Sequence, residues 1–261
     1  MNQKFTNQVI LITGAASGLG YAVAEEIASE SGKVALVDIN LDALEEAKKN
    51  LLGKYPNAEI ITLKADVSSE EETKNYVNET VKAYGRIDGF YNNAGIEGKQ
   101  AKLSEYDVNV FKKVIDINLY GVYYGMKYVI PVMRKQKYGL IVNTSSVGGI
   151  LGVFNQTPYV ASKHAVAGMT KNAAVEYACD GITVNAIAPG AILTPMVAHS
   201  FEQINPTDPK KAEFEFAQGN PTKRLGLPEE VAKVVSFLLS GETRYINGQV
   251  IAIDGGQSIL Y

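Results

Sequence analysis

The amino-acid sequence predicts an α/β fold in which a doubly wound, seven-stranded parallel sheet carries helices on both faces within a single domain. Three observations support this fold. Short apolar runs alternate with longer helical patterns along the 261-residue chain. The runs are apolar throughout, which is typical of strands buried on both faces of a parallel sheet. The residues that follow the runs are rich in Gly, Ser, Asn and Asp, and ligands bind at this edge of such sheets.

The first half of the chain repeats a strand–helix unit. The predicted strands lie at 8–13, 33–38, 58–66 and 87–95. The predicted helices lie at 18–30, 41–54 and 68–85, and two further helices fill 104–136. Small residues along one side of 18–30 suit close packing on a strand, and 41–54 is amphipathic.

The second half continues the pattern with one interruption. Strands are predicted at 139–146, 181–190 and 248–256, and helices at 157–178 and 228–239. The segment 194–227 breaks the alternation because it contains four prolines: Pro195, Pro206, Pro209 and Pro221. A long insertion of this kind beside the carboxyl ends of strands is where a substrate lid belongs. The prediction is one domain over 1–261, with a lid at about 194–227.

Composition excludes several classes of function. A net charge of −3 and a pI of about 5.6 argue against a nucleic-acid binder, which would show a basic stripe. The most apolar stretch, 120–133, contains Lys127 and is too short to span a bilayer. The single cysteine, Cys179, excludes an intrachain disulfide and is expected to be a small core residue. With no signal-peptide pattern, we expect a cytoplasmic protein without a membrane partner.

A glycine-rich loop follows the first predicted strand. In "TGAASGLG" the glycines are Gly14, Gly18 and Gly20. Glycine is required where a backbone turns with positive φ, approaches a phosphate or packs helix on strand. The helix that follows offers free N–H groups to a pyrophosphate, and Ser17 could add a hydroxyl. The alternative is a tight turn without a ligand, because the spacing differs from the common dinucleotide pattern.

The second strand ends in Asp38, which strengthens the dinucleotide interpretation. A carboxylate at this position accepts hydrogen bonds from an adenosine ribose and repels a 2′-phosphate. The glycine loop has no Arg or Lys to offset that charge. The sequence therefore predicts NAD rather than NADP. Asp66, at the end of the third strand, is predicted to reach the adenine, to cap the helix at 68–85, or to do both.

Two Tyr–Lys pairs have the i, i+4 spacing that places both side chains on one helical face. They are Tyr159–Lys163 and Tyr123–Lys127. Only the first follows closely on a strand end, which supplies Ser146. Tyr123–Lys127 lies in the middle of a helix and is predicted to be a surface or interface pair.

A lysine beside a tyrosine changes the chemistry that the phenol can perform. A cation about 5 Å away contributes roughly 3 kcal/mol at an effective dielectric of about 20, which lowers the phenol pKa from about 10. An oxidised nicotinamide ring would lower it further. Tyr159 could then exchange a proton with an alcohol or ketone. His164 faces away from Tyr159 on the same helix and is predicted to have a structural or surface role.

Taken in order, these features resemble the short-chain dehydrogenase/reductase family over essentially the whole chain. They are "TGAASGLG" (13–20), "NNAG" (92–95), Asn118, Ser146, "YVASK" (159–163) and "PGAILT" (189–194). The resemblance implies a Rossmann-type fold and a catalytic tetrad. Tyr159 would be the acid/base, Lys163 would lower its pKa and hold the nicotinamide ribose, Ser146 would orient the substrate oxygen, and Asn118 would hold a water. Ser145 is the alternative to Ser146.

The resemblance also extends the predicted binding sites. The predicted cofactor contacts are Gly14, Ser17, Gly18, Leu19, Gly20, Asp38, Ile39, Asp66, Val67, Asn93, Ala94, Gly95, Tyr159, Lys163, Pro189, Gly190, Ile192 and Thr194. The predicted substrate contacts are Ser146, Phe154, Gln156 and Tyr159, and no metal site is expected.

The expected activity is NAD(H)-dependent interconversion of a secondary alcohol and a ketone, with a cyclic ketone or diketone as the favoured substrate. Sugar or polyol dehydrogenases and 3-oxoacyl thioester reductases are the alternatives within the family. A non-enzymatic NAD sensor and a Ser–His hydrolase are the alternatives outside it. The family implies a homotetramer, and a second apolar face on the helices at 104–136 and 157–178 favours the same conclusion.

Overall fold

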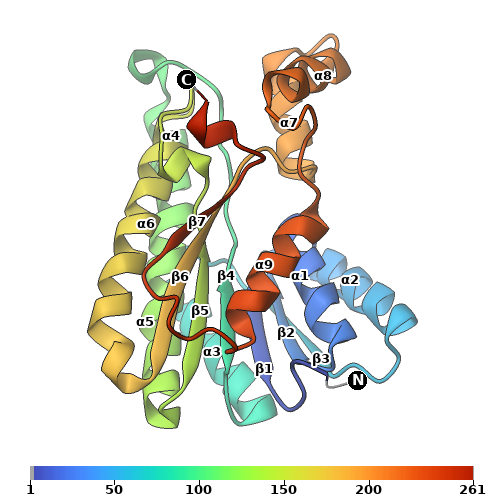
Figure 1. Cartoon of the computed structure of the whole chain (residues 1–261), viewed down its shortest axis with the longest axis vertical. Helices are drawn as coiled ribbons and strands as arrows, with labels where there is room; N and C mark the ends of the chain where they lie inside the picture. The colour runs from blue at the N-terminus through green and yellow to red at the C-terminus, as the bar shows by residue number, and fades with distance from the viewer. Residues whose placement is uncertain (1–2, 261) are drawn as a thin grey trace.

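The predicted parallel sheet is present in the computed structural model, which describes residues 3–260 (Figure 1). All six pairs of neighbouring strands are parallel, in the order β3-β2-β1-β4-β5-β6-β7. The strands are β1 Val9–Thr13, β2 Lys33–Asp38, β3 Ile60–Lys64, β4 Gly89–Asn92, β5 Gly139–Thr144, β6 Ile182–Pro189 and β7 Val250–Ile253. The strand order reverses between β1 and β4, and this switch point is where such sheets bind ligands.

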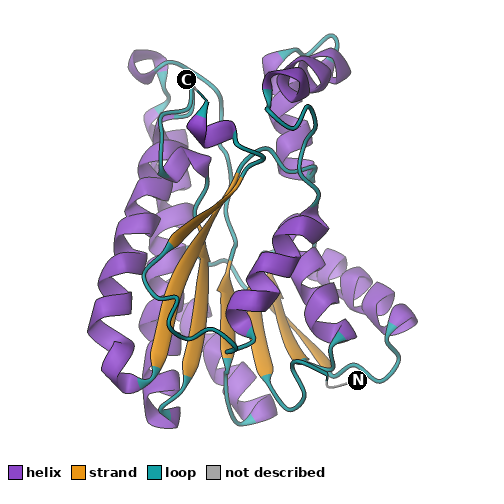
Figure 2. Cartoon of the chain, viewed as in Figure 1, coloured by secondary structure: helices purple, strands orange, loops and turns teal. Residues whose placement is uncertain are grey.

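Helices cover both faces of the sheet (Figure 2). Ile10 and Ile12 of β1 pack in one apolar core with α1 (Gly18–Ser29), α2 (Leu41–Lys54) and α9 (Pro228–Leu239). Leu11, between them, packs in a second core with α3 (Glu70–Tyr84), α5 (Gly121–Gln136) and α6 (Thr157–Tyr177). Alternate side chains of one strand therefore bury on opposite faces, which is why the strands are apolar throughout. The predicted doubly wound fold is confirmed.

The segment predicted as a lid folds into two helices of its own, α7 (Pro195–Ile204) and α8 (Pro209–Gly219). They lie at the top of Figure 1, beyond the main layers. Pro195 and Pro209 each begin a helix, where proline has no N–H to leave unsatisfied and its fixed φ is already helical. Two of the prolines that interrupt the strand–helix pattern are therefore helix starts. Phe201, Ala212 and Leu225 form a small core of their own.

Three local expectations differ from the structure. The helices predicted at 104–136 begin with α4 (Val108–Ile115) and continue through a π-helical turn, Asp116–Tyr120, directly into α5. Cys179 is exposed rather than part of the core. Asp66 does not cap α3, because Ser69 is the N-cap and Asp66 instead accepts hydrogen bonds from Ser68.

Within the described part of the chain, no helix is long and apolar enough to cross a membrane. In the same residues, no group of His, Cys, Asp and Glu side chains is arranged to hold a metal ion.

Candidate active site

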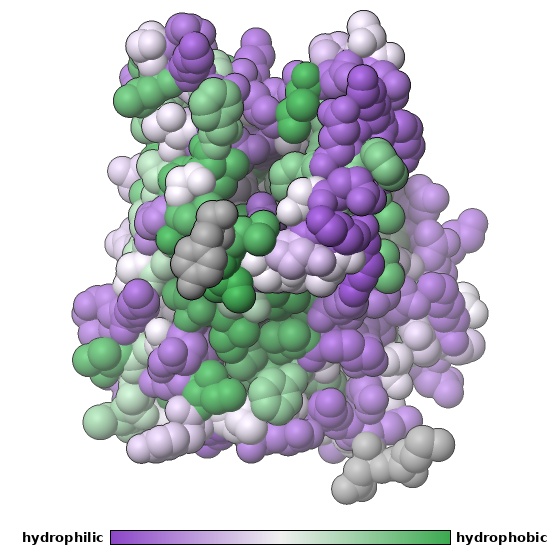
Figure 3. All heavy atoms as spheres, turned by 45° about the horizontal axis from the view of Figure 1, so that its top comes forward, coloured by the Kyte–Doolittle hydropathy of each residue, from purple (hydrophilic) through white to green (hydrophobic). Residues whose placement is uncertain are grey.

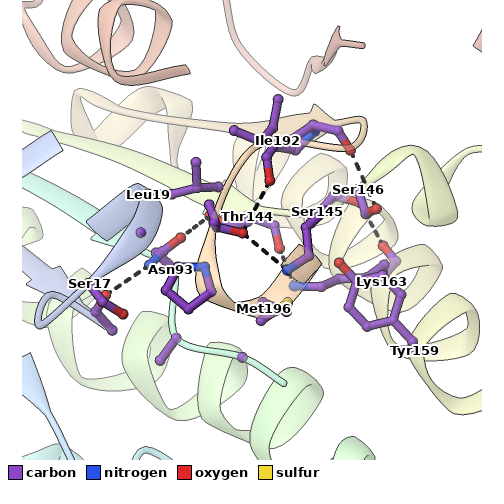
Figure 4. Close-up of a pocket in the computed structure, with 18 of the residues that line it drawn as sticks. Ser17, Leu19, Asn93, Thr144, Ser145, Ser146, Tyr159, Lys163, Ile192 and Met196 are labelled. Atoms are coloured by element: carbon purple, nitrogen blue, oxygen red, sulfur yellow. Dashed lines mark hydrogen bonds between the residues drawn. The ribbon is translucent and has the colours of Figure 1, made fainter. Parts of the chain in front are cut away.

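Two adjoining pockets lie at the carboxyl ends of the strands (Figure 4 shows the first). The first extends from the glycine loop and Asp38, past the ends of β4 and β5, to the start of α7. The second has a cavity volume of about 570 Å³, within the usual range for small-molecule sites. Ser146, Tyr159, Gly190, Met196 and Val197 line both pockets. A ligand in one pocket therefore meets a ligand in the other at these residues.

The glycine loop has the backbone conformation that the sequence predicts. Gly14 and Gly18 have φ values of 64° and 55°, which L side chains rarely adopt. Ser17 precedes α1 without capping it through its side chain, and Ser17, Gly18 and Leu19 line the first pocket. The N–H groups of the first turn of α1 are therefore at the edge of a pocket, as a pyrophosphate site requires.

Asp38 lies at the far end of the same pocket. Its carboxylate accepts hydrogen bonds from the backbone N–H of Ala16, at 3.2 Å, and of Asn40, at 3.1 Å. These bonds fix the carboxylate between the glycine loop and the start of α2. The loop and the fixed carboxylate together fit the pyrophosphate and adenosine ribose of a nicotinamide dinucleotide.

The loop after β4 forms the middle of the pocket wall. Asn93 donates from Nδ2 to the carbonyl of Thr13 at 3.0 Å, and Thr144 Oγ1 donates to Asn93 Oδ1 at 3.2 Å. The Thr13 hydroxyl accepts from the N–H groups of Asn93 and Ala94. Side chains from β1, from the loop after β4 and from β5 thus hold one another, and they keep Asn93, Ala94 and Gly95 at the pocket surface.

The structure separates the two candidate serines. The Ser145 hydroxyl is buried and donates to the backbone carbonyl of Lys163 at 2.9 Å, so its hydrogen-bonding capacity serves the junction of β5 and α6. Ser146 Oγ accepts from the N–H of Gly148 at 3.1 Å and lies beside the Tyr159 phenol. Ser146 is therefore the serine placed with Tyr159 between the two pockets.

Lys163 is almost fully buried, with 2% of its surface exposed. Its Nζ donates to the carbonyl of Thr144 at 2.7 Å and lies 5.5 Å from the centroid of the Tyr159 ring. Burial lowers the pKa of Lys163 to about 8, because desolvation penalises the ammonium.

Tyr159 does not have the lowered pKa that the spacing argument led us to expect. Burial raises the pKa of its phenol, the Ser146 hydroxyl opposes that rise, and the charge of Glu97 adds to it. Desolvation of the phenolate by burial is the largest of these effects. The protein groups alone therefore leave Tyr159 as a protonated phenol near neutral pH, which is the form that donates a proton.

Some predicted residues do not line either pocket: Gly20, Ile39, Asp66, Val67 and Asn118. A Cβ on Gly20 would lie 2.0 Å from the carbonyl oxygen of Gly14, so this glycine keeps the loop closed onto α1. Asn118, in the π-helical turn, accepts from the N–H of Ile96 and donates to its carbonyl, both at 2.8 Å. Its amide therefore holds the loop that follows β4.

The predicted substrate residues Phe154 and Gln156 both line the second pocket. Glu97 and Gln100 were not predicted, and Met196, Val197 and Ser200 were predicted only as part of the lid at about 194–227; all five residues line one or both pockets. Their position after "NNAG" and within α7 was the available signal. His164 is exposed and its Nδ1 lies 3.0 Å from the carbonyl of Val160, away from both pockets, as predicted.

The chain was compared with known proteins. A family model described as "Enoyl-(Acyl carrier protein) reductase" matches residues 14–258. Levodione reductase of Leifsonia aquatica is 52% identical over 258 residues, covering 99% of this chain and 97% of that protein. Cyclohexanol dehydrogenase of Acinetobacter sp. (strain SE19) is 39% identical, covering 98% of this chain and 96% of that protein.

Solved structures agree. The crystal structure of levodione reductase superimposes with a TM-score of 0.97 at 52% identity, covering 98% of this chain and 100% of that one. NAD⁺-bound xylitol dehydrogenase superimposes with a TM-score of 0.93 at 35% identity, covering 97% of this chain and 100% of that one. ElxO with NADP bound superimposes with a TM-score of 0.89 at 35% identity, covering 97% of this chain and 99% of that one. With motifs, fold and relatives in agreement, the chain belongs to the short-chain dehydrogenase/reductase family and is an oxidoreductase that uses a nicotinamide cofactor.

Proposed function

We propose that this oxidoreductase interconverts a cyclic secondary alcohol and the corresponding ketone or diketone, with NAD(H) as cofactor. The observation that carries the proposal is the pair Ser146 and Tyr159, which lines the dinucleotide pocket and the second pocket together. The relatives named levodione reductase and cyclohexanol dehydrogenase support a cyclic substrate. Initial rates with cyclic ketones, cyclic diketones and polyols, each with NADH and NADPH or their oxidised forms, test the proposal.

The roles of the residues follow from their positions. When bound, the nicotinamide cofactor donates or accepts hydride. Ser146 orients the substrate oxygen toward Tyr159, whose phenol donates its proton to that oxygen during reduction and takes it back during oxidation. Lys163 stabilises the phenolate left by that proton transfer. Asn118 acts indirectly, because it holds the loop that carries Gly95. Its Oδ1 lies so close to this loop that a Cβ added to Gly95 would be only 3.1 Å from it.

The lowered pKa of Lys163 gives a prediction about pH. The ammonium predominates below its pKa of about 8 and is lost as the pH rises through that value. The Tyr159 pKa is raised, so the phenol keeps its proton in that range. We expect kcat/KM for ketone reduction at saturating NADH to fall above about pH 8. Initial rates from about pH 6 to pH 10 measure this. A flat profile across that range would contradict the role of Lys163.

The cofactor preference depends on Asp38. In Asp38→Ala we expect the ratio of kcat/KM for NADH to that for NADPH to fall by at least about 10-fold, because the carboxylate no longer accepts from the ribose or repels a 2′-phosphate. Asp42→Ala, an exposed acid in the first turn of α2, is the control and should leave the ratio unchanged. A wild type that already prefers NADPH would overturn the NAD assignment. That result would also favour the alternative function, a 3-oxoacyl thioester reductase.

The proposed assembly is a cytoplasmic homotetramer. Exposed apolar side chains on two helices support the oligomer: Tyr120 and Tyr123 next to or on α5, and Val175 on α6. The edge strand β7 is also incompletely covered, and Figure 3 shows apolar surface gathered over the centre and left of that view. Sedimentation analysis of the purified protein tests this assembly.

A further inference from the structure

Glu97 is a carboxylic acid buried in the wall of the second pocket, with 8% of its surface exposed. It follows the "NNAG" loop of β4. Its Oε1 accepts three hydrogen bonds: from Gln100 Nε2 at 3.0 Å, from Gln156 Nε2 at 2.5 Å and from the Ser200 hydroxyl at 2.8 Å. These donors come from the same loop, from the residue before α6 and from α7. Oε1 of the carboxyl is therefore occupied by hydrogen bonds from the protein itself.

The other oxygen, Oε2, is buried and has no hydrogen-bond partner among residues 3–260. The other buried charged groups, Asp88 and Lys163, both have partners. Asp88 pairs with Arg86, and Lys163 donates to Thr144. Glu97 makes no ion pair within the described chain. A buried polar atom without a partner costs about 1–3 kcal/mol, and more if it is charged. Groups kept at that cost are concentrated at functional sites.

The second pocket places this carboxyl in the same cavity as the reacting groups. Ser146 and Tyr159 line it together with Glu97, and Glu97 is near enough for its charge to act on the Tyr159 phenol. The remaining wall includes the apolar side chains of Val147, Phe154, Met196, Phe201 and Phe216, and the polar side chains of Gln100, Asn155, Gln156, Ser200, Gln203 and Gln257 also line it. A ligand that fills this cavity therefore meets Ser146 and Tyr159, apolar side chains, and further polar groups that include the Glu97 carboxyl.

We propose that Glu97 Oε2 is a second substrate contact, which selects ring ketones that carry a second oxygen substituent, hydroxyl or carbonyl, away from the reacting carbonyl. The inference rests on the proposed function and names its substrate class more closely. An ionised carboxyl accepts from a hydroxyl and a protonated one donates to a carbonyl, so both substituents share this chemistry. Gln100, Gln156 and Ser200 hold the carboxyl in place for the contact.

The test compares three ketones with NADH: cyclohexanone, the diketone with its second carbonyl on the opposite ring carbon, and the corresponding hydroxy ketone. In Glu97→Met we expect the preference for the better of the two oxygenated ketones over cyclohexanone, as a ratio of kcat/KM, to fall at least about 10-fold. Cyclohexanone serves as the reference substrate in each variant, because removing the Glu97 charge also changes the surroundings of the Tyr159 phenol for all three ketones. Comparing ratios between variants cancels the different intrinsic reactivity of the ketones.

Glu97→Gln is the matched control for folding, because it keeps an acceptor for the three donors and a polar atom at the Oε2 position. Its selectivity should fall less than that of Glu97→Met. An equal loss for all three ketones, or an unchanged preference in Glu97→Met, would overturn the contact while leaving the proposed function standing. A wild type that reduces none of the three ketones with either cofactor would overturn the proposed function, and the inference with it.

Discussion

Tyr159→Phe is expected to lower kcat for ketone reduction by at least about 100-fold while leaving NADH binding intact. The phenol lies between the two pockets and keeps its proton at neutral pH, so it is placed to donate that proton to the substrate oxygen. Phenylalanine keeps the ring, which packs beside the Lys163 ammonium, and removes only the hydroxyl. Turnover by NADH oxidation and NADH affinity by fluorescence titration separate the loss of chemistry from the loss of binding.

The chain offers a matched control for this experiment. Tyr123 has the same spacing to a lysine, Lys127, but that lysine pairs with Glu70 on the surface. Tyr123→Phe should therefore retain turnover within about 2-fold. Near-normal turnover in Tyr159→Phe would remove Tyr159 from the mechanism. An equal fall in both variants would point to a structural effect on α5 and α6 instead.

Gly20→Ala is expected to have the second large effect, although Gly20 does not line the cofactor pocket. The added Cβ would lie 2.0 Å from the Gly14 carbonyl oxygen and 3.0 Å from the Ala15 Cα. Both atoms belong to the backbone, so no side chain can move aside to make room. The loop must separate from α1, which displaces the amides aimed at the pyrophosphate. We expect NADH affinity to fall at least about 100-fold and the free energy of unfolding to fall by about 3 kcal/mol.

Gly53→Ala is the control, because a Cβ at that position in α2 has nothing within 4 Å. Alanine in place of a helical glycine should raise stability by roughly 0.5–1 kcal/mol. Calorimetric titration with NADH and thermal unfolding measure the two effects. If Gly20→Ala binds NADH as wild type does, the tight loop is not what forms the cofactor site.

The sequence predicted most of the fold because strands buried on both faces are short, continuously apolar runs, whereas the helices between them are longer and carry polar faces. β2, α2 and α9 begin and end at the predicted residues. Strand ends were overestimated where polar loop residues continue the extended run, as at 93–95 after β4. The π-helical turn was not predicted from the local pattern, and its residue Asn118 bonds to Ile96, which lies 22 residues away in the chain.

The sequence predicted some residues of the candidate site and not others, because burial and long-range contacts are not visible in a local pattern. Spacing placed Ser146, Tyr159 and Lys163 together, but it could not show how deeply they are buried. The direction of the Tyr159 pKa was therefore wrong for the protein groups alone. Glu97 was missed because its partners, Gln156 and Ser200, lie 59 and 103 residues away in the chain. A single sequence gives no sign that such distant polar residues converge.

Helix α7 contributes to both pockets: Pro195, Met196 and Val197 line the first, and Ser200, Phe201, Gln203 and Ile204 line the second. The two ligands thus share one short element of structure. If cofactor binding favours one position of α7, it changes the free energy of substrate binding. Linkage requires that substrate binding change the free energy of cofactor binding by the same amount. A substitution in α7 is therefore expected to change the cooperativity between the two ligands. Measuring the affinity for only one of the ligands would not detect that change.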